Sequence, residues 1–143
     1  MGDKYDILKL ENQVCFPLYA CSKEVVRKYK PMLDALDLTY TQYITMMVMW
    51  EHEKMSVKQL GEKLYLDSGT LTPVLKTLEK KGYVTRKRDS KDERQVNVSV
   101  TNEGMALREE ALEVPVKMGQ CINLSPEEGK QLYQLLYKLL RND

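Results

Sequence analysis

The segment from Ser56 to Val84, "SVKQLGEKLYLDSGTLTPVLKTLEKKGYV", restricts the fold of this chain more than any other part of the sequence. Its apolar residues recur every three or four positions in two short stretches that a polar turn separates, which indicates two short helices. Ser56 is a typical cap for the first helix, and either Asp67 or Ser68 for the second. Gly82 follows two lysines and is a typical helix stop. Two short helices joined by a tight turn predict a helix-turn-helix.

Two stretches with β-branched alternation follow this motif directly. They read "YVTRKR" and "VNVSVT", and the polar, turn-forming segment "DSKDERQ" lies between them. This pattern is typical of a two-stranded hairpin with a long charged tip. A hairpin directly after a helix-turn-helix predicts a winged helix. The expected fold class is therefore mainly α with a small β-hairpin wing.

Helices are also expected on both sides of this central part. Apolar positions from Ile7 to about Tyr29 recur at helical spacing, and Pro31 is expected to stop or redirect that helix before a short one, "PMLDAL". A third helix, "TYTQYITMMVMWEH", has Thr39 as a possible cap and an apolar centre, so it is expected in the core. After the hairpin, one helix is expected from Thr101 with a kink at Pro115, and a last one from Ser125.

The two ends of the chain are expected to pair two copies of the protein. The last helix carries a stripe of leucines that a small domain cannot cover by itself. We therefore expect one domain, 1–143, in which 1–36 and 102–143 are dimerisation helices and 37–101 is the winged-helix DNA-binding part.

Charge is divided unevenly along the chain. Residues 54–95 hold 11 basic and 6 acidic side chains, whereas the remainder holds 11 and 15. A basic centre between acidic ends suits a central segment that faces a polyanion such as double-stranded DNA. A basic face that is merely solvated would give the same count.

Several other function classes lack a sequence signal. The chain has no Gly-rich phosphate loop and no Ser/His/Asp set, and the single histidine, His52, lies far from the cysteines, so neither metal nor cofactor is expected. The N-terminus has no signal-peptide pattern, and no apolar run is long enough to span a membrane. These features favour a cytoplasmic protein without membrane partners.

The second helix of the motif offers polar groups to a major groove. Its outward residues are expected to be Ser68, Thr70, Thr72, Pro73 and Lys76, opposite the leucine face. Hydroxyls and a proline ring can contact base edges and thymine methyls, and a lysine can reach a base or a phosphate. In the alternative interpretation Ser68 only caps the helix and the threonines are solvated.

The hairpin carries further candidates for DNA contact. Arg86 and Arg88 lie on its first strand, and Arg94 lies at its tip with Asp92 two residues away. An exposed arginine on a narrow projection suits the minor groove, and the aspartate can hold the guanidinium in place. The alternative for "KDER" is an ordinary charged turn.

The sequence resembles the MarR family of dimeric winged-helix regulators and, within it, the organic hydroperoxide resistance regulators. The resemblance covers Leu10 to Gly104 and lies in "LENQVCFPLY", "YKPMLDALDLTYTQY", "LGEKLYLDSGTLTPVLKTLEKKGYVTRKR" and "DERQVNVSVTNEG". It implies that Cys15 is a peroxide sensor whose thiolate becomes sulfenic acid, with Tyr29 and Tyr40 as hydrogen-bond donors to the sulfur. Tyr19, one helical turn from Cys15, is a third possible donor.

The apolar wall expected around the sensor would favour organic peroxides over hydrogen peroxide. Its residues are Phe16, Leu18, Met46 and Met47.

The other two cysteines receive different roles. Some members of the family have a second cysteine that forms a disulfide between subunits, and the resemblance implies this resolving role for Cys121; alternatively, Cys121 is a small apolar residue on a helix face. Cys21 lies on the apolar stripe of the first helix and is expected to be a buried, inert thiol. Pro17 indicates that the first helix either starts near Phe16 or bends beside Cys15.

Three functional hypotheses follow. The first is a homodimeric repressor that binds a pseudo-palindromic operator when reduced and leaves it when an organic hydroperoxide oxidises Cys15. In the second, the same repressor is released by a reversible ligand such as a phenolic acid. The third, a thiol peroxidase that consumes peroxide through Cys15, is least favoured because a scavenger has no need of a basic winged helix.

Overall fold

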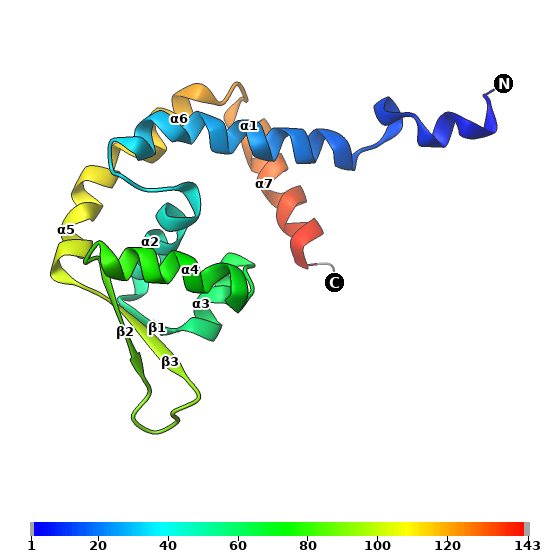
Figure 1. Ribbon diagram of the computed structural model, residues 1–143. Coiled ribbons are helices and arrows are strands. Elements are labelled where there is room, and N and C mark those ends of the chain that lie inside the picture. Colours follow the sequence, from blue (N-terminus) through cyan, green and yellow to red (C-terminus); the bar gives the residue numbers. More distant parts are fainter. Residues whose placement is uncertain (1, 142–143) are drawn as a thin grey trace.

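The computed structural model describes residues 2–141 and shows a mostly helical chain with one small sheet (Figure 1). The elements, in order, are the 3₁₀ helices η1 (Lys4–Leu8) and η2 (Leu10–Asn12), then α1 (Cys15–Asp34), α2 (Tyr40–His52), β1 (Lys54–Ser56), α3 (Val57–Leu64), α4 (Ser68–Lys80), β2 (Val84–Arg88), β3 (Val96–Val100), α5 (Asn102–Ala111), α6 (Glu113–Cys121) and α7 (Pro126–Arg141). The predicted fold class is confirmed.

The helix-turn-helix is formed by α3 and α4, and its ends are capped as the sequence predicts. The Ser56 hydroxyl accepts a hydrogen bond from the Gln59 backbone N–H at 3.1 Å, and the Gln59 side chain accepts one from the Ser56 N–H. Of the two possible caps for α4, Asp67 takes the role, since its carboxylate accepts the Thr70 N–H at 2.8 Å. Gly82 has φ +87° and ends the motif in the left-handed region that favours glycine.

The wing belongs to a three-stranded antiparallel sheet of order β1-β3-β2. The hairpin pairs Val84 with Val100 and Arg88 with Val96, as the alternating pattern predicts. The third strand, β1, pairs Lys54 with Ser99 and was not expected, because three residues are too few to show an alternation. It joins the wing to α2 and α3.

The core lies under the helix-turn-helix and against α2. Its fully buried side chains are Met46, Met49, Leu60, Leu71, Leu75, Leu78, Val84 and Val98. The helix predicted around residues 39–52 is therefore core, as expected.

The first helix differs from its prediction at both ends. It begins at Cys15 rather than near Ile7, so Pro17 lies in the first turn. Backbone N–H groups in a first turn have no helical acceptor, so a proline there removes no helical hydrogen bond. This bears out the alternative in which the helix starts beside Phe16. The helix also continues through Pro31, because burial of Leu33 contributes about 1.5–3 kcal/mol, which offsets most of the ~3 kcal/mol cost of an interior proline.

The predicted kink at Pro115 is confirmed as a break between α5 and α6. Pro115 has no N–H to bond the carbonyl of Ala111, and the helix is interrupted at Leu112.

Gly104 sets how closely α5 packs against the winged helix. A Cβ at this position would lie 2.2 Å from the Tyr83 carbonyl oxygen, so only glycine fits. The Trp50 Nε1–H donates to the Gly104 carbonyl at 2.8 Å and ties α5 to α2.

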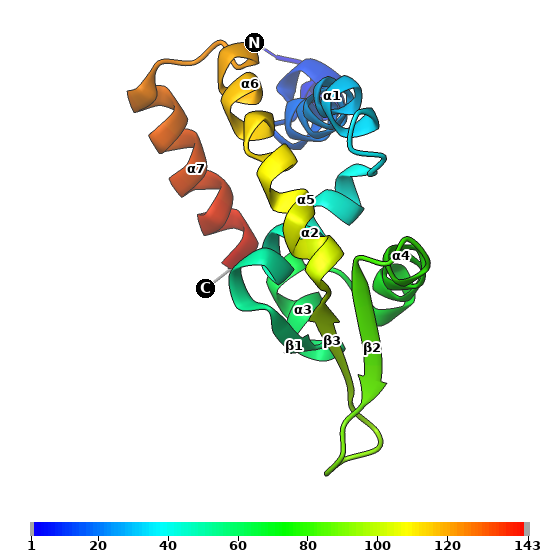
Figure 2. The same cartoon turned by 90° about the vertical axis from the view of Figure 1, so that its left-hand side faces the viewer.

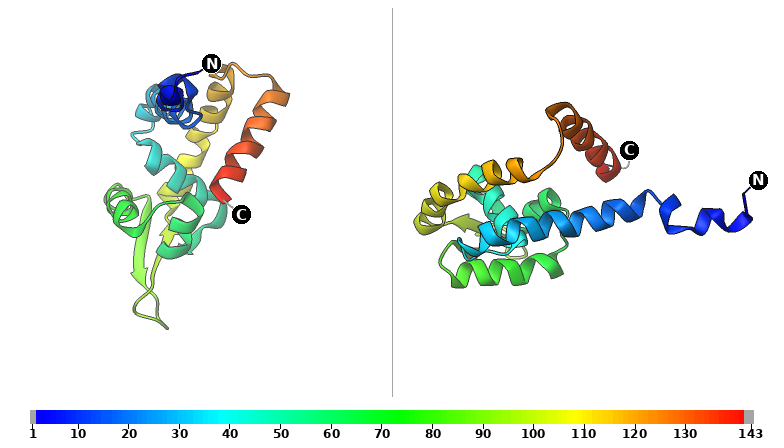
Figure 3. Two further views of the ribbon diagram at one scale, coloured as in Figure 1. Left: turned by 90° about the vertical axis from the view of Figure 1, so that its right-hand side faces the viewer. Right: turned by 90° about the horizontal axis from the view of Figure 1, so that it is seen from above.

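The two ends of the chain extend away from this core. The N-terminal half of α1 and the segment before it project outward, and α7 lies on another side of the molecule (Figures 2 and 3). None of the residues of α7 that the structure describes is buried. Residues 1 and 142–143 of the expected dimerisation segments lie outside the described residues. Among residues 2–141, no helix combines the length and the apolar character that a bilayer span requires.

Candidate nucleic-acid interface and thiol site

The outer face of α4 is polar, and its inner face is apolar. Ser68, Thr70, Pro73 and Lys76 are exposed, as predicted for residues that meet a groove. Thr72 is half-buried, and its hydroxyl donates to the Ser68 carbonyl at 2.7 Å. Hydrogen bonds from Thr70 lower the pKa of the Asp67 carboxyl, so this cap is ionised at neutral pH.

The wing projects from the opposite end of the molecule to α1 (Figure 1). The Arg94 side chain at its tip is 93% exposed, and the Asp92 carboxylate accepts both the Arg94 backbone N–H at 3.1 Å and its Nε–H at 3.3 Å. Arg88 is exposed, and its guanidinium donates to the Glu93 carbonyl at 2.8 Å; this hydrogen bond stabilises the tip of the wing. The sequence predicted this arrangement of Asp92 and Arg94.

Arg86, which is expected to contact DNA, also forms an ion pair that the sequence did not predict. Its side chain is 24% exposed, and its guanidinium Nη2 lies 3.1 Å from Glu79 Oε1 on α4. The Arg86 backbone N–H also donates to Glu79 Oε2 at 3.2 Å. Arg86 therefore links the wing to α4, and its contact with DNA stays a prediction.

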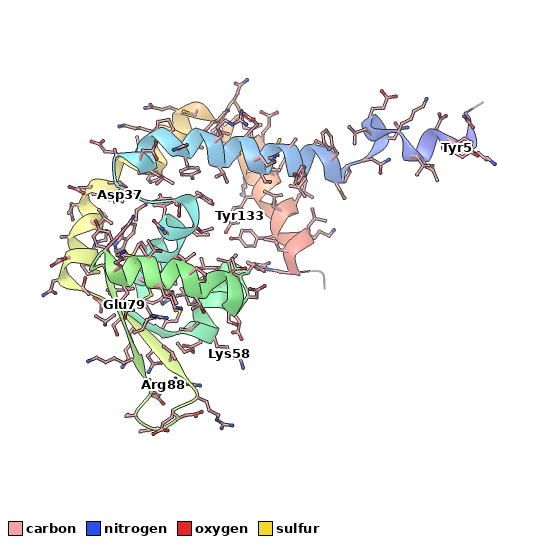
Figure 4. All side chains as sticks on the ribbon, in the orientation of Figure 1. Tyr5, Asp37, Lys58, Glu79, Arg88 and Tyr133 are labelled. Carbon is pink, nitrogen blue, oxygen red and sulfur yellow. The ribbon has the colours of Figure 1, made fainter. Side chains whose placement is uncertain are left out.

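An open concavity of about 1050 Å³ lies between α3, α4 and the wing. Its lining includes Ser68, Thr72 and Arg94 together with two residues that the sequence analysis did not single out, Lys58 and Tyr65. Lys58 lies on α3, beside the wing (Figure 4). Tyr65 is exposed and has φ +56°, which is unusual for a bulky residue. No sequence pattern marks this backbone conformation.

Two predicted sensor residues, Tyr29 and Tyr40, lie together at the junction of α1 and α2. Their ring centroids are 4.9 Å apart, and Tyr43, which the sequence analysis missed, joins them at 5.8 Å from Tyr29. Burial raises the pKa of all three phenols. They are therefore neutral O–H donors at physiological pH.

Cys15 is not in contact with these tyrosines in its own chain. It is the first residue of α1, and Tyr29 lies 14 residues further along the same helix, which corresponds to about 21 Å at 1.5 Å per residue. Tyr19, Phe16 and Leu18 near Cys15 are exposed. Of the other two residues of the expected apolar wall, Met46 is buried in the core and Met47 is exposed on α2. One chain alone does not assemble the expected peroxide pocket.

The other cysteines are also exposed, and all three are free thiols. Exposure of Cys21 corrects the prediction that it is buried: the half of α1 that carries it projects from the core, so its apolar stripe has no cover within the chain. Cys121 ends α6, and its carbonyl accepts a hydrogen bond from Lys28 Nζ at 3.5 Å. Lys28 lies 13 residues beyond Cys15 on α1, about 20 Å at helical rise.

A disulfide between Cys15 and Cys121 of one chain would need their Cα atoms within about 7 Å, and in the folded chain both thiols are free. Within residues 2–141, no cluster of His, Cys, Asp and Glu has the arrangement of a metal site.

The chain is similar to known transcriptional regulators. Residues 27–111 match the family described as "Transcriptional regulator SarA/Rot". The organic hydroperoxide resistance transcriptional regulator of Bacillus subtilis is 51% identical, over 98% of this chain and 95% of its own length.

Solved structures of AbfR of Staphylococcus epidermidis resemble the chain in fold. Reduced AbfR bound to DNA gives a TM-score of 0.80 at 32% identity, over 97% of this chain and 96% of that one. Disulfide-formed AbfR gives a TM-score of 0.68 at 33% identity, over 96% of each chain.

These relatives confirm the resemblance found in the sequence and favour a regulator over a thiol peroxidase. The match extends through the cysteine-bearing first helix, the winged helix and the C-terminal helices, because it covers nearly the whole chain. The chain therefore belongs to the SarA/Rot family of transcriptional regulators and, with them, to the MarR-type winged-helix regulators that include the organic hydroperoxide resistance regulator.

Proposed function

We propose that this protein is a homodimeric repressor that binds a pseudo-palindromic DNA operator when reduced and leaves it when an organic hydroperoxide oxidises Cys15. The observation that carries the proposal is the 51% identity to an organic hydroperoxide resistance regulator over 98% of this chain. A protein that acts on chromosomal operators works in the cytoplasm.

In this proposal, the two functions occupy different parts of one domain. Residues 37–101 form the DNA-binding part, supported by the polar outer face of α4 and the exposed Arg94 at the wing tip. Residues 1–36 and 102–143 pair two copies, supported by the exposed apolar residues of α1 and α7. In a dimer, the two α4 helices would enter successive major grooves about 34–36 Å apart.

The sensor is assembled between two chains. Because Cys15 lies about 21 Å along α1 from Tyr29 of its own chain, the phenols that bind its sulfur are Tyr29 and Tyr40 of the partner subunit. Neutral phenols donate hydrogen bonds to a thiolate and favour its charged form. Tyr19, on the next turn of the same helix as Cys15, supplies a third donor.

The chemical step consumes one hydroperoxide per sensor. The Cys15 thiolate attacks the distal oxygen, an S–O bond forms, the O–O bond breaks, and the alcohol leaves after taking up a proton. The thiol of Cys121 of the partner subunit then attacks the sulfenic sulfur, forms the disulfide and releases water. Since Cys121 is exposed at the end of α6, it is free to make this approach when the ends of the dimer rearrange.

Operator binding tests the proposal. A duplex selected by the reduced protein from a random-sequence library is titrated before and after treatment with cumene hydroperoxide. We expect the peroxide to weaken binding by the native protein at least tenfold and to leave Cys15→Ser bound. Equal release of Cys15→Ser by peroxide would contradict the mechanism. Release by a non-oxidising phenolic acid, with all thiols still titratable, would support the reversible-ligand hypothesis instead.

Non-reducing electrophoresis tests the role of Cys121. Peroxide should produce a covalent dimer in the native protein and in Cys21→Ser, but not in Cys121→Ser. A covalent dimer that persists in Cys121→Ser would exclude Cys121 as the resolving residue.

A further inference from the structure

Lys81 connects the recognition helix to the turn between α1 and α2. It follows the last residue of α4, and its ammonium donates to the Asp37 carbonyl oxygen. The same nitrogen lies 3.4 Å from the Asp37 carboxylate and 3.4 Å from Gln42 Oε1. The Lys81 side chain is 25% exposed, whereas its neighbour Lys80 is on the exposed surface.

The groups that bind Lys81 are parts of a well-defined turn. Asp37 has φ +55°, and the Leu38 N–H closes the turn by donating to the Leu33 carbonyl at 3.0 Å. Gln42 is 8% exposed, and its Oε1 also accepts the Thr39 backbone N–H at 3.1 Å in the capping box of α2. Two of the three groups that bind Lys81, the Asp37 carbonyl and Gln42 Oε1, are therefore held by the turn and by the cap of α2.

The same cap places a sensor tyrosine. Tyr40 is the first residue of α2, between Thr39 and Gln42, and its ring packs against Tyr29. A displacement of Tyr40 together with this cap would shift Gln42 Oε1, one of the oxygen atoms to which Lys81 is bound. Figure 4 shows the two sides of this junction, with Asp37 at the turn and Glu79 on the last turn of α4.

The wing shares the same helix end. Glu79, two residues before Lys81, holds Arg86 of β2 through its carboxylate. A shift of the C-terminal end of α4 therefore reaches both DNA-contacting elements, the recognition helix and the wing.

We propose that Lys81 is the positioning residue that couples the thiol switch to the DNA-binding face. In the reduced dimer it holds the end of α4 against the α1–α2 turn, and oxidation of Cys15 displaces Tyr40 of the partner subunit and breaks this link. The inference rests on the proposed function, because it requires that Cys15 controls DNA binding through the tyrosines.

The test compares Lys81→Met with Lys80→Met, which removes the same charge from the neighbouring exposed position. For each protein, the operator dissociation constant is measured in the reduced and the peroxide-treated state, and the oxidised thiols are counted. The quantity compared is the dissociation constant of the peroxide-treated protein divided by that of the reduced protein. We expect Lys81→Met to oxidise normally while its ratio falls at least fivefold toward one, and Lys80→Met and Lys81→Arg to keep the native ratio.

Lys81→Met that oxidises fully and keeps the native ratio would overturn the inference while leaving the proposed function intact. A ratio of one in the native protein would overturn the proposed function, and the inference with it. If Lys81→Met fails to fold, Lys81→Gln, which keeps a shorter uncharged donor, replaces it with the same two outcomes.

Discussion

The winged helix and the terminal helices of this chain differ in how far one copy can complete them. Leu71, Leu75 and Leu78 on α4 are fully buried in the core of a single chain. On α7, by contrast, the described residues include none that is buried, and Tyr133, labelled in Figure 4, is exposed among leucines. The winged helix is therefore packed within one chain, whereas the terminal helices leave apolar faces that a second copy would cover in the proposed dimer.

The difference explains where the switch can act. Movement within a packed winged helix breaks core contacts, but movement of the terminal helices changes only how two copies meet. Cys15 and Cys121 both lie in the terminal helices, and the partly buried Tyr29 and Tyr40 lie where α1 joins α2. Oxidation can thus change the geometry of the dimer while leaving each DNA-binding part intact.

The largest expected effect separates the two regions by stability. Leu75→Ala should lower the free energy of unfolding by about 2–5 kcal/mol, because it leaves a cavity in a core that one chain completes. Leu139→Ala, at an exposed position of α7, should destabilise only through dimer formation, so its effect should shrink as dilution separates the subunits. Denaturant unfolding at two protein concentrations a hundredfold apart measures both. An effect of Leu139→Ala that does not vary with concentration would contradict the comparison.

A smaller effect separates two arginines of the wing. Arg94→Ala should weaken operator binding by about 1–3 kcal/mol, because this side chain is free to enter a groove. Arg86→Ala removes a partly exposed ion pair and should cost about 1 kcal/mol or less of folding stability, with discrimination between operator and random DNA retained. Fluorescence anisotropy with both duplexes distinguishes the two arginines. The roles assigned here would be reversed if Arg86→Ala lost discrimination and Arg94→Ala kept it.

The smallest expected effect concerns Tyr65. Its backbone lies in the left-handed region, which a glycine would adopt without strain. Tyr65→Gly should leave the fold as stable or stabilise it by about 1 kcal/mol, yet weaken operator binding several-fold, because the exposed side chain lines the DNA-facing concavity. Thermal unfolding and operator titration of one sample give both values. Unchanged operator affinity would show that Tyr65 does not contact DNA.

Local signals in the sequence predicted the winged helix well. The caps Ser56 and Asp67, the stop at Gly82 and the alternation of the hairpin each depend on neighbouring residues, and each is confirmed in the structure. The start of α1 was predicted too early, because apolar residues at helical spacing before Cys15 lie in two 3₁₀ turns instead.

The errors at the site have a different physical origin. Cys21 was predicted to be buried because its stripe is apolar, but a stripe does not reveal whether the same chain or a second copy covers it. Periodicity also cannot show that Glu79 lies within reach of Arg86, so their ion pair was not predicted, and the contact of Arg86 with DNA stays a prediction. The distance between Cys15 and the tyrosines likewise follows only from the length of the continuous helix.

Mixed dimers test most directly whether the sensor is completed by the second copy. In one, Cys15→Ser in the first chain faces Tyr29→Phe/Tyr40→Phe in the second; in the other, all three substitutions lie in the first chain and the second is native. Each has a single Cys15, whose rate of oxidation by cumene hydroperoxide is measured. We predict rapid oxidation in the first mixed dimer, where the remaining cysteine meets intact tyrosines across the interface, and slow oxidation in the second. The reverse order would show that each chain builds its own sensor and would contradict the account.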